Sequence, residues 1–317
     1  PLVFGNNDTP GVMLSSAAKE YIKVYGVLVG KKPLIFTNND SGYETAIEFK
    51  KNGVNPLILD TRKEPSSDII TEAKNLGIEI KYSYVVVAAK GYKKVKSADI
   101  AKISDNKKDL SNIENIECDC ICVSGFWTPS IHLASQSGNK SEFNEKIDAF
   151  IPKKSKQKEN TIGSANGKFT LEETINEAFD KGYEVSNKIT ENNNKVSIPT
   201  VVEKKSTEHD KFWCVPLPKG KSYKRFLDFQ NDVAVTDIEL ALREGFRSIE
   251  HVKRYTTLGM ATDQGKTSNL NGLQLVSDIE NKVVPQVGHT TFRPPYTPVS
   301  IGAIVGREVG KHSKPTR

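Results

Sequence analysis

The chain has 317 residues, of which 37% are hydrophobic and 26% are charged, and its formal net charge is +6. This length provides for two or three domains with a substantial core. No apolar run is long enough to cross a bilayer, and no basic segment followed by an apolar one indicates a secretory signal. Lysine-rich runs at 90–96 and 153–158 are typical of solvated surface. We therefore expect neither a membrane nor a nucleic acid as a partner.

The first part of the chain alternates between helical and extended patterns. Apolar and small residues recur at a helical period over 11–26, and further helices are predicted over 43–52 and 67–76. Apolar runs predict strands over 32–37, 55–60 and 78–89. This order of elements predicts an α/β fold, in which helices connect the strands of a parallel sheet.

Three cysteines alternate along the next apolar run, at Cys118, Cys120 and Cys122. In a strand over 118–125 all three would lie on one face. A metal site would need a fourth ligand and usually a Cys-x-x-Cys turn, so a buried strand is the preferred interpretation. Cys214 stands alone. Because nothing in this pattern requires a disulfide, a reducing compartment such as the cytoplasm is favoured.

The second half of the chain is organised differently. A helix is predicted over 170–182, and the polar composition of 186–223 is typical of a linker. From residue 224 the pattern indicates a small helical domain: Thr236 and Glu239 are spaced as a capping box, and helices follow over 249–255 and 268–281. The tail, 285–317, is rich in proline and glycine and is predicted to be extended.

The first candidate phosphate site is the turn at 37–42, between a predicted strand and helix. A helix N-terminus there would offer free N–H groups to a dinucleotide, although the usual Gly-x-Gly-x-x-Gly is replaced by Thr37, Asn38, Asn39, Asp40, Ser41 and Gly42. Asp60 follows about 20 residues later, where an acid would hold a ribose hydroxyl of NAD, and Arg62 leaves NADP open. Asp40 would repel a phosphate. A Rossmann-like domain that has lost its nucleotide is therefore the alternative.

The second candidate is the segment 259–268. It resembles a P-loop, but five residues separate its glycines where a Walker A loop has four, so it does not indicate an NTPase. Its last residues stand at a predicted helix N-terminus, which attracts anions. The sequence therefore predicts a phosphate-bearing ligand near two clusters of cations and hydroxyls: Lys253, Arg254, Thr256 and Thr257, and Lys266, Thr267 and Ser268. The alternative is a solvated basic helix end.

A third, weaker candidate is Gly163-Ser-Ala-Asn166-Gly167, which precedes a helix. It would either complete a second dinucleotide site or serve as an ordinary helix entry. The five histidines are scattered, none has the spacing of a zinc ligand, and no hydrolytic triad can be assembled.

Several segments resemble the alpha subunits of heterotetrameric sarcosine oxidases. They are 1–14, 35–41, 123–129, 164–167, 228–233, 293–299 and, most specifically, the string Glu-His-Val-Lys-Arg-Tyr-Thr-Thr-Leu-Gly-Met-Ala-Thr-Asp-Gln-Gly-Lys-Thr-Ser-Asn at 250–269. The resemblance covers almost the whole chain. It implies an internal piece of a longer subunit, without the N-terminal iron-sulfur-type domain and the C-terminal aminomethyltransferase-like domain that handles folate.

The resemblance also implies a division of the chain. Residues 1–30 would end the first half of a split dinucleotide-binding domain, and 116–185 would return to it. Residues 31–115 would form an inserted NAD-type Rossmann-like domain of the pyridine-nucleotide-reductase kind. A linker, 186–223, would lead to a small helical flavin-contacting domain, 224–284, and a second extended linker, 285–317, to the absent C-terminal domain.

For function, the resemblance implies a role in oxidising sarcosine or another secondary amine. The beta subunit would carry FAD and the amine pocket, and the alpha subunit would hold NAD and share FMN with it; gamma and delta subunits would complete the complex. The FMN phosphate is expected near the two clusters at 253–257 and 266–268. NAD is expected either on the turn at Asn38 with Asp60, or in the first nucleotide fold, completed by Gly125 and Asn166.

We expect no catalytic residue within the chain itself. Some members of the wider amine dehydrogenase group carry paired cysteines for an iron-sulfur cluster in the middle domain, whereas the matching stretch here, 226–231, has no cysteine. We therefore expect no cluster in this chain, and we assign no metal ligands. Two other interpretations are a nucleotide-binding scaffold and a stand-alone pyridine-nucleotide-dependent flavoprotein reductase. The second would require a redox pair of cysteines, which the sequence lacks.

Overall fold

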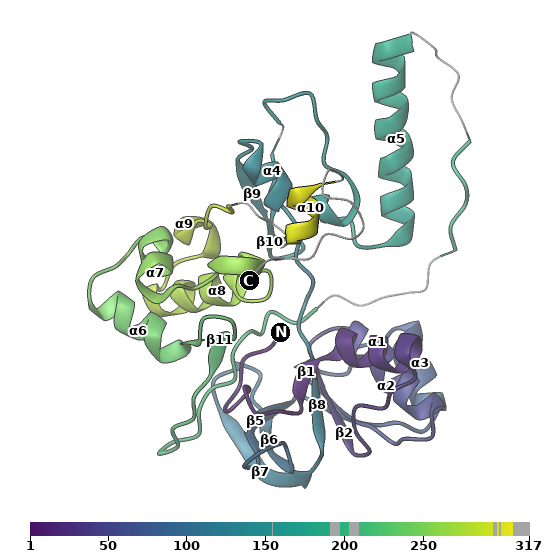
Figure 1. The fold of residues 1–317 in the computed structure, drawn as a ribbon. Coiled ribbons are helices and arrows are strands. Elements are labelled where there is room, and N and C mark those ends of the chain that lie inside the picture. Colours follow the sequence, from purple (N-terminus) through teal and green to yellow (C-terminus); the bar gives the residue numbers. More distant parts are fainter. Residues whose placement is uncertain (154, 191–196, 203–208, 294–296, 298, 307–317) are drawn as a thin grey trace.

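A parallel five-stranded sheet is the centre of the N-terminal half (Figure 1). The structure, a computed structural model, describes residues 1–153, 155–190, 197–202, 209–293, 297 and 299–306. The strands are β1 (Val12–Leu14), β2 (Pro33–Thr37), β3 (Leu57–Asp60), β4 (Glu79–Tyr82) and β8 (Cys120–Ser124), in the order β1-β8-β2-β3-β4. All neighbouring pairs are parallel, as the alternation of helices and strands predicts.

The two faces of this sheet are covered by different layers. One carries the helices α1 (Ser15–Tyr25), α2 (Ser41–Lys51) and α3 (Asp68–Asn75), which bury Ile35 and Ile58. The other carries an antiparallel sheet of β5 (Tyr84–Lys90), β6 (Ser97–Ile103) and β7 (Leu110–Glu117), against which Leu34 and Phe36 pack. Because both faces are covered, every residue of β2 is buried, and its sequence is continuously apolar up to Thr37.

Of two local predictions, one is confirmed and one is wrong. The run over 78–89 is extended, as predicted, and forms two strands, because Ser83 has a left-handed backbone (φ 55°) at which the chain leaves the parallel sheet for the antiparallel one. The three alternating cysteines do not share a face. Cys120 and Cys122 lie beneath the helices, whereas Cys118 joins the core of the antiparallel layer. Cys118 precedes β8, and Asp119 between them accepts backbone hydrogen bonds from Lys31 and Lys32.

The sheet spans the expected domain boundaries at 30/31 and 115/116. β1 and β8 pair with each other, and β8 also pairs with β2, so residues on both sides of each boundary build one sheet. α1 packs against α2 in the same helical layer. β8, which is expected in the return segment 116–185, is thus an inner strand of the same sheet as β2 and β3.

The segment 116–185 continues beyond β8 into smaller elements. They are α4 (His132–Gln136), the hairpin of β9 (Ser141–Asn144) and β10 (Ala149–Pro152), the 3₁₀ turn η1 (Gly163–Asn166) and the helix α5 (Leu171–Thr190). No residue of α5 is buried, and Figure 1 shows this helix standing apart from the other elements.

The predicted linker over 186–223 contains buried structure. α5 extends into it to Thr190, and Phe212 and Val215 lie in the core of the antiparallel layer. Val3 and Cys214 form a parallel bridge. The linker prediction for 210–215 was therefore wrong, because three apolar side chains in this polar stretch, those of Phe212, Trp213 and Val215, are buried.

The last third forms a second, helical core, as predicted. It contains the strands β11 (Phe226–Asp228) and β12 (Val233–Ala234) and the helices α6 (Val235–Arg243), α7 (Ile249–Thr256), α8 (Asn269–Glu280) and α9 (Val284–Val287). The cap of α6 differs from the predicted pair: Asp237 accepts the N–H of Ala234 at 2.7 Å. In the tail, α9 and α10 (Ile301–Val305) are helical rather than extended, and residues 294–296, 298 and 307–317 lie outside the described residues.

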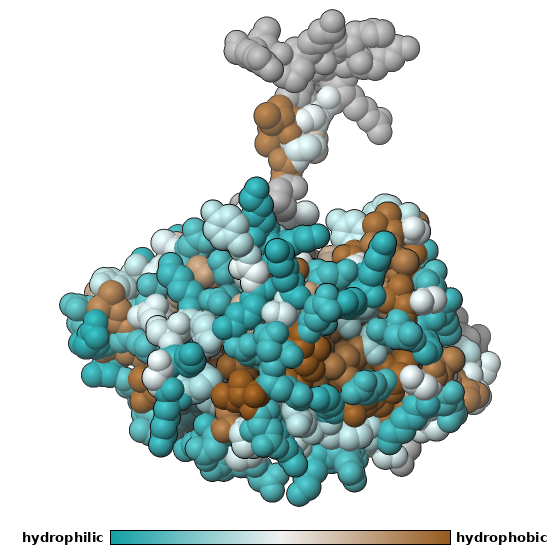
Figure 2. All heavy atoms as spheres, turned by 90° about the horizontal axis from the view of Figure 1, so that it is seen from below, coloured by the Kyte–Doolittle hydropathy of each residue, from teal (hydrophilic) through white to brown (hydrophobic). Residues whose placement is uncertain are grey.

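The surface agrees with the composition. The face in Figure 2 is largely hydrophilic, with separate hydrophobic patches between charged side chains. Among the described residues, none of the helices is both long and apolar enough to span a bilayer. The same residues contain no group of three or more His, Cys, Asp or Glu side chains that could hold a metal ion.

Candidate functional site

The turn between β2 and α2 lies where a nucleotide is expected in this kind of sheet. Strand order reverses between β2 and β8, and ligands of open α/β sheets bind beyond the carboxyl ends of the strands at such a point. Thr37 ends β2, Ser124 ends β8, and Gly42 opens the first turn of α2. A Cβ on Gly42 would lie 2.6 Å from the Cβ of Thr37, so only glycine permits this close approach of helix and strand.

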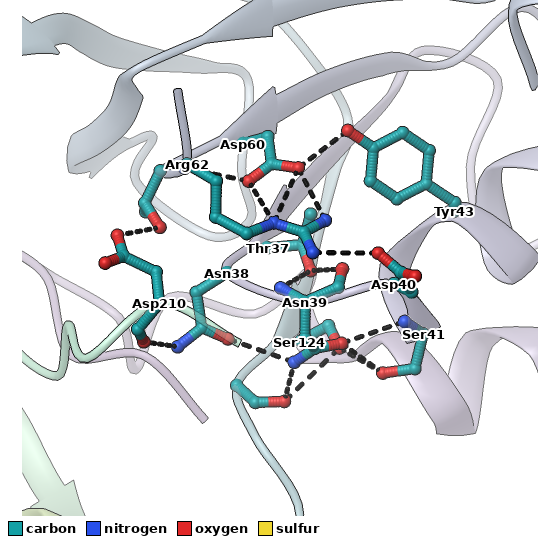
Figure 3. A network of polar contacts seen from close by, with 12 residues as sticks. Thr37, Asn38, Asn39, Asp40, Ser41, Tyr43, Asp60, Arg62, Ser124 and Asp210 are labelled. Carbon is teal, nitrogen blue, oxygen red and sulfur yellow. Dashed lines mark hydrogen bonds and ion pairs between the residues drawn. The ribbon is translucent and has the colours of Figure 1, made fainter. Parts of the chain in front are cut away.

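The amide of Asn39 occupies the centre of this turn (Figure 3). Its Oδ1 accepts hydrogen bonds from the backbone N–H of Ser41 at 2.9 Å and from the hydroxyls of Ser41 and Ser124. Its Nδ2 donates to Oδ1 of Asn38 at 3.0 Å and to the carbonyl of Gly125. Asn39 thus takes up the N–H and hydroxyl groups that would otherwise face a pyrophosphate.

Asp60, the expected ribose ligand, is fully buried. Its carboxylate accepts hydrogen bonds from the hydroxyl of Tyr43 at 2.6 Å and from Nε and Nη2 of Arg62 at 3.0 and 2.8 Å. Nη1 of Arg62 also pairs with Asp40 at 2.8 Å. Figure 3 shows Arg62 lying between the two carboxylates. Arg62 therefore neutralises the charge of Asp40, which was expected to repel a phosphate. It also pairs with Asp60, so the carboxylate expected to bind a ribose is buried within the protein.

The pKa values of this network follow from burial and charge. Burial by itself would lower the pKa of Arg62, but its hydrogen bonds to Asp60 and Asp40 raise that pKa above its ordinary value. Burial, followed by the charge of Asp60, raises the pKa of Tyr43 well above its usual range. Tyr43 and Arg62 are thus held as permanent donors to Asp60 at any ordinary pH.

A cavity of about 290 Å³ lies beside this turn and borders on the N-terminus of α8. From the sheet it is lined by Leu14, Ser41, Ser124 and Gly125, and from the helical domain by Lys266, Thr267 and Asn271. The structure therefore brings Ser41, Gly125, Lys266 and Thr267 together, although the sequence assigned them to three separate sites.

The lining suits an anion that carries a polar or aromatic group. It includes the lysines Lys19 and Lys266 and the aromatic side chains of Phe126 and Trp127, and the described residues contribute no Asp or Glu to it. Besides Thr267, five residues with hydroxyl side chains line it: Ser16, Ser41, Ser124, Thr128 and Ser130. Lys19 is paired with Glu44 at the rim. Its volume of about 290 Å³ is close to the smallest volumes typical of ligand pockets, which range from about 300 to 1,000 Å³.

His132 at the start of α4 also lines the cavity and is buried. Burial lowers its pKa to about 4. A hydrogen bond with the backbone of Gln264 opposes this shift, and the nearby charges of Lys266 and Lys253 add to it. Its ring lies 4.0 Å from that of Phe292. His132 is therefore a neutral side chain in the wall at neutral pH.

The other residues of the predicted phosphate clusters do not line the cavity. Lys253 is buried, donates from Nζ to the carbonyl of Thr291 at 3.0 Å, and has a pKa that burial lowers. Thr256 donates its hydroxyl to Val252 within α7, Thr257 forms the left-handed end of that helix, and Arg254 is exposed. Ser268 is buried 3.4 Å from Asp228. Of this group, only Lys266 and Thr267 face the ligand space.

Asn166 is also away from the cavity. Its Nδ2 donates to Glu177 of α5 at 2.7 Å, and the same carboxylate accepts the N–H of Gly163. It fixes the entry into α5, which agrees with the ordinary helix-entry interpretation. Sequence reasoning missed Lys19, His132 and Asn271, because only the packing of α1, α4 and α8 around one space gives them a shared role.

Comparison with known proteins finds similarity to sarcosine oxidase sequences. Residues 222–307 match the model of the Sarcosine oxidase A3 domain. The whole chain is 36% identical, over 319 residues, to the Sarcosine oxidase subunit alpha of Rhizobium meliloti (strain 1021), of which it covers 31%. It is 32% identical, over 333 residues, to that of Corynebacterium sp. (strain U-96), of which it covers 33%. The chain thus spans about a third of the length of these relatives.

Among solved structures, the L-proline dehydrogenase from P. horikoshii has a similar fold. The TM-score is 0.56 at 20% sequence identity, and the similarity covers 97% of this chain and 56% of that one. At this identity the likeness concerns the fold, and it supports the Rossmann-like α/β class.

Proposed function

We propose that this chain, which is 36% identical over its whole length to a Sarcosine oxidase subunit alpha, forms an internal part of such a subunit in an oxidase of sarcosine or a related secondary amine. In this proposal the subunit belongs to an oxidoreductase, which the names of the similar proteins support. In this proposal the chain performs no amine chemistry itself. It binds a nucleotide cofactor next to a beta subunit that carries FAD. The complex is cytoplasmic and also contains gamma and delta subunits.

The observation that carries the cofactor part of the proposal is the cavity between the sheet and α8. It combines the carboxyl ends of β1, β8 and the β2–α2 turn with a helix N-terminus and a lysine, Lys266, and the described part of the chain contributes no carboxylate to its lining. Such a helix end and cation favour a phosphate. We propose that the phosphate of FMN lies against Lys266 and Thr267, with NAD as the second candidate because Gly125 borders the same space.

The test is a pair of substitutions in the full-length protein within its complex. Lys266→Ala removes the cation, whereas Lys266→Arg retains it. With the loss of one charge-assisted contact of about 1.5–3 kcal/mol, we expect Lys266→Ala to weaken retention of the cofactor by tenfold or more. The measurement is the amount of FMN and of NAD released per complex on denaturation, after dialysis.

Lys63→Ala serves as the matched control, because Lys63 is exposed and pairs only weakly, at 3.7 Å, with the exposed Asp105. The cofactor whose content falls in Lys266→Ala but not in Lys266→Arg identifies the ligand of the cavity. Unchanged contents of both FMN and NAD in Lys266→Ala would contradict the proposal.

A further inference from the structure

A second feature of the sheet concerns the crevice beyond the carboxyl ends of β2 and β3. In a dinucleotide fold this edge receives the adenosine half of the cofactor, next to the acid that ends the second strand. Here the acid is Asp60, and the edge is crossed by the segment 210–213, called the strap below. The strap lies about 150 residues away in the chain, inside the stretch that the composition assigns to a linker.

The strap is bound to the ends of both strands. The backbone N–H of Asp210 donates to the carbonyl of Asn38 at 2.9 Å, and Nδ2 of Asn38 donates back to the carbonyls of Asp210 and Phe212 at 2.9 and 3.3 Å. At the next strand, the hydroxyl of Thr61 donates to the carboxylate of Asp210 at 2.8 Å. Asn38 and Thr61 are fully buried as a result.

The carboxylate of Asp210 is also neutralised at this edge. Nζ of Lys107, from the loop between β6 and β7, lies 2.7 Å from Asp210 and 2.8 Å from the carbonyl of Thr61. The anion at the ends of β2 and β3 is thus the carboxylate of Asp210, a residue of this chain, and it is bound by the hydroxyl of Thr61 and the ammonium group of Lys107. Phe212, two residues later, is anchored in the core of the antiparallel layer, so the strap is fixed by packing as well.

The other polar groups of a dinucleotide site are also bonded to residues of this chain. Asn39 accepts the N–H of Ser41 in the β2–α2 turn, and Asp60 accepts hydrogen bonds from Arg62 and Tyr43. The crevice contains three carboxylates, of Asp40, Asp60 and Asp210, and two cations, of Arg62 and Lys107. A pyrophosphate would add two negative charges beside this excess of carboxylates, in a partly buried place where repulsion is poorly screened.

We infer that the crevice over β2 and β3 takes no nucleotide and that the strap is its permanent occupant, with Asp210 in the position of an anionic ligand. The Rossmann-like fold then serves as a clamp that fixes the segment between α5 and the helical domain. NAD, where the full subunit binds it, lies elsewhere. This inference is independent of the cofactor proposed for the Lys266 cavity, because it concerns the other side of Asn39.

Two substitutions test the inference in the full-length protein within its complex. Thr61→Val keeps the shape of a buried side chain and removes the hydroxyl that donates to Asp210; Asp210→Asn keeps the shape and removes the charge. Asp105→Asn, at an exposed carboxylate that pairs with Lys63, is the matched control. The measurements are the hydrogen exchange of the amides at 210–213 and the NAD and FMN released per complex.

We expect exchange in the strap to be about tenfold faster in Asp210→Asn and several-fold faster in Thr61→Val, since each loses hydrogen bonds that hold it. The NAD and FMN contents should equal those of the control in both variants. A loss of NAD in Thr61→Val would overturn the inference, because it would place the nucleotide at the ends of β2 and β3. Unchanged exchange in both variants would overturn it as well, because the strap would not depend on these contacts. Neither result depends on the outcome for Lys266.

Discussion

Two helix N-termini of this protein border the same cavity and differ in how their polar side chains are paired. At α2 the residues of the turn are bound to one another: Asn39 to Ser41, Ser124 and Gly125, and Asp40 to Arg62. At α8 a lysine and a threonine, Lys266 and Thr267, are exposed and line a cavity. Both segments combine Asn, Ser, Thr and Gly ahead of a helix, and both satisfy the local criteria for an anion site.

The difference lies in what surrounds each helix end. Asn39 and Asp40 supply acceptors at the start of α2, so the donors there are satisfied within the protein. At α8, the loop presents Gly265 in a left-handed conformation (φ 73°), where a Cβ would lie 2.1 Å from Oδ1 of Asn269. The chain there passes close to the helix and leaves the Lys266 side chain at the surface. Both helix ends border the same cavity, and the chain supplies acceptors near both, at Asn39 for Ser41 and at Asp263 for Gly265. They differ in that α8 adds the exposed Lys266 and Thr267 to the lining.

The largest expected effect is on the α2 side, in the variant Arg62→Ala. It leaves the buried carboxylate of Asp60 without its cation, which typically costs about 3–5 kcal/mol of the free energy of unfolding. Denaturant titration at neutral pH measures this loss. Removing Lys63, the exposed neighbour, should change the free energy of unfolding by less than about 0.5 kcal/mol. If Arg62→Ala cost no more than Lys63→Ala, the buried network would not be what stabilises this edge.

The pH dependence separates the regions further, because His132 lies on the α8 side. Its pKa in the folded protein, about 4, is below the ordinary 6.5, so the unfolded state binds the proton more tightly. The stability from the neutral imidazole is complete above about pH 6.5 and is lost as the pH falls towards 4. We expect a loss of up to about 3 kcal/mol over this interval, measured by denaturant unfolding at several pH values.

His132→Gln should flatten this part of the pH profile, since it removes the titrating group. His251→Gln is the control, because His251 is exposed on α7. The assignment to His132 would be wrong if the slope between pH 6.5 and 4 were as steep in His132→Gln as in the control.

Much of the fold follows from local pattern. Apolar runs predict β2 and β3, and helical patterns predict α2, α3 and α8, each within a few residues of its observed bounds. The pairing of β8 between β1 and β2 could not be predicted, since it joins residues more than 80 positions apart. The strap escaped prediction for a similar reason: Phe212 and Val215 stand in a polar stretch, and only tertiary contact identifies them as core.

The candidate site was predicted only in part. The chemistry of the residues indicates Lys266, Thr267 and Ser41, and the family resemblance indicates Gly125, whereas their common cavity depends on how the two domains pack. Asp60 was selected by its spacing, but Arg62 stands two residues later and folds back onto it. An arginine that close to a presumed ribose acid is a signal of internal pairing that the sequence already contained.

The smallest expected effects come from removing one hydroxyl in each region. Ser124→Ala deletes a buried hydroxyl that lies 2.9 Å from the hydroxyl of Ser41 and also donates to Asn39, so a loss of about 1 kcal/mol in the free energy of unfolding is expected. Thr267→Ala changes an exposed side chain and should stay within about 0.5 kcal/mol. Cofactor retention should show the reverse order, because Thr267 faces the proposed phosphate and Ser124 is engaged by Asn39. Equal losses of stability in the two variants would mean that both helix ends are closed in the same way, and the contrast between them would not hold.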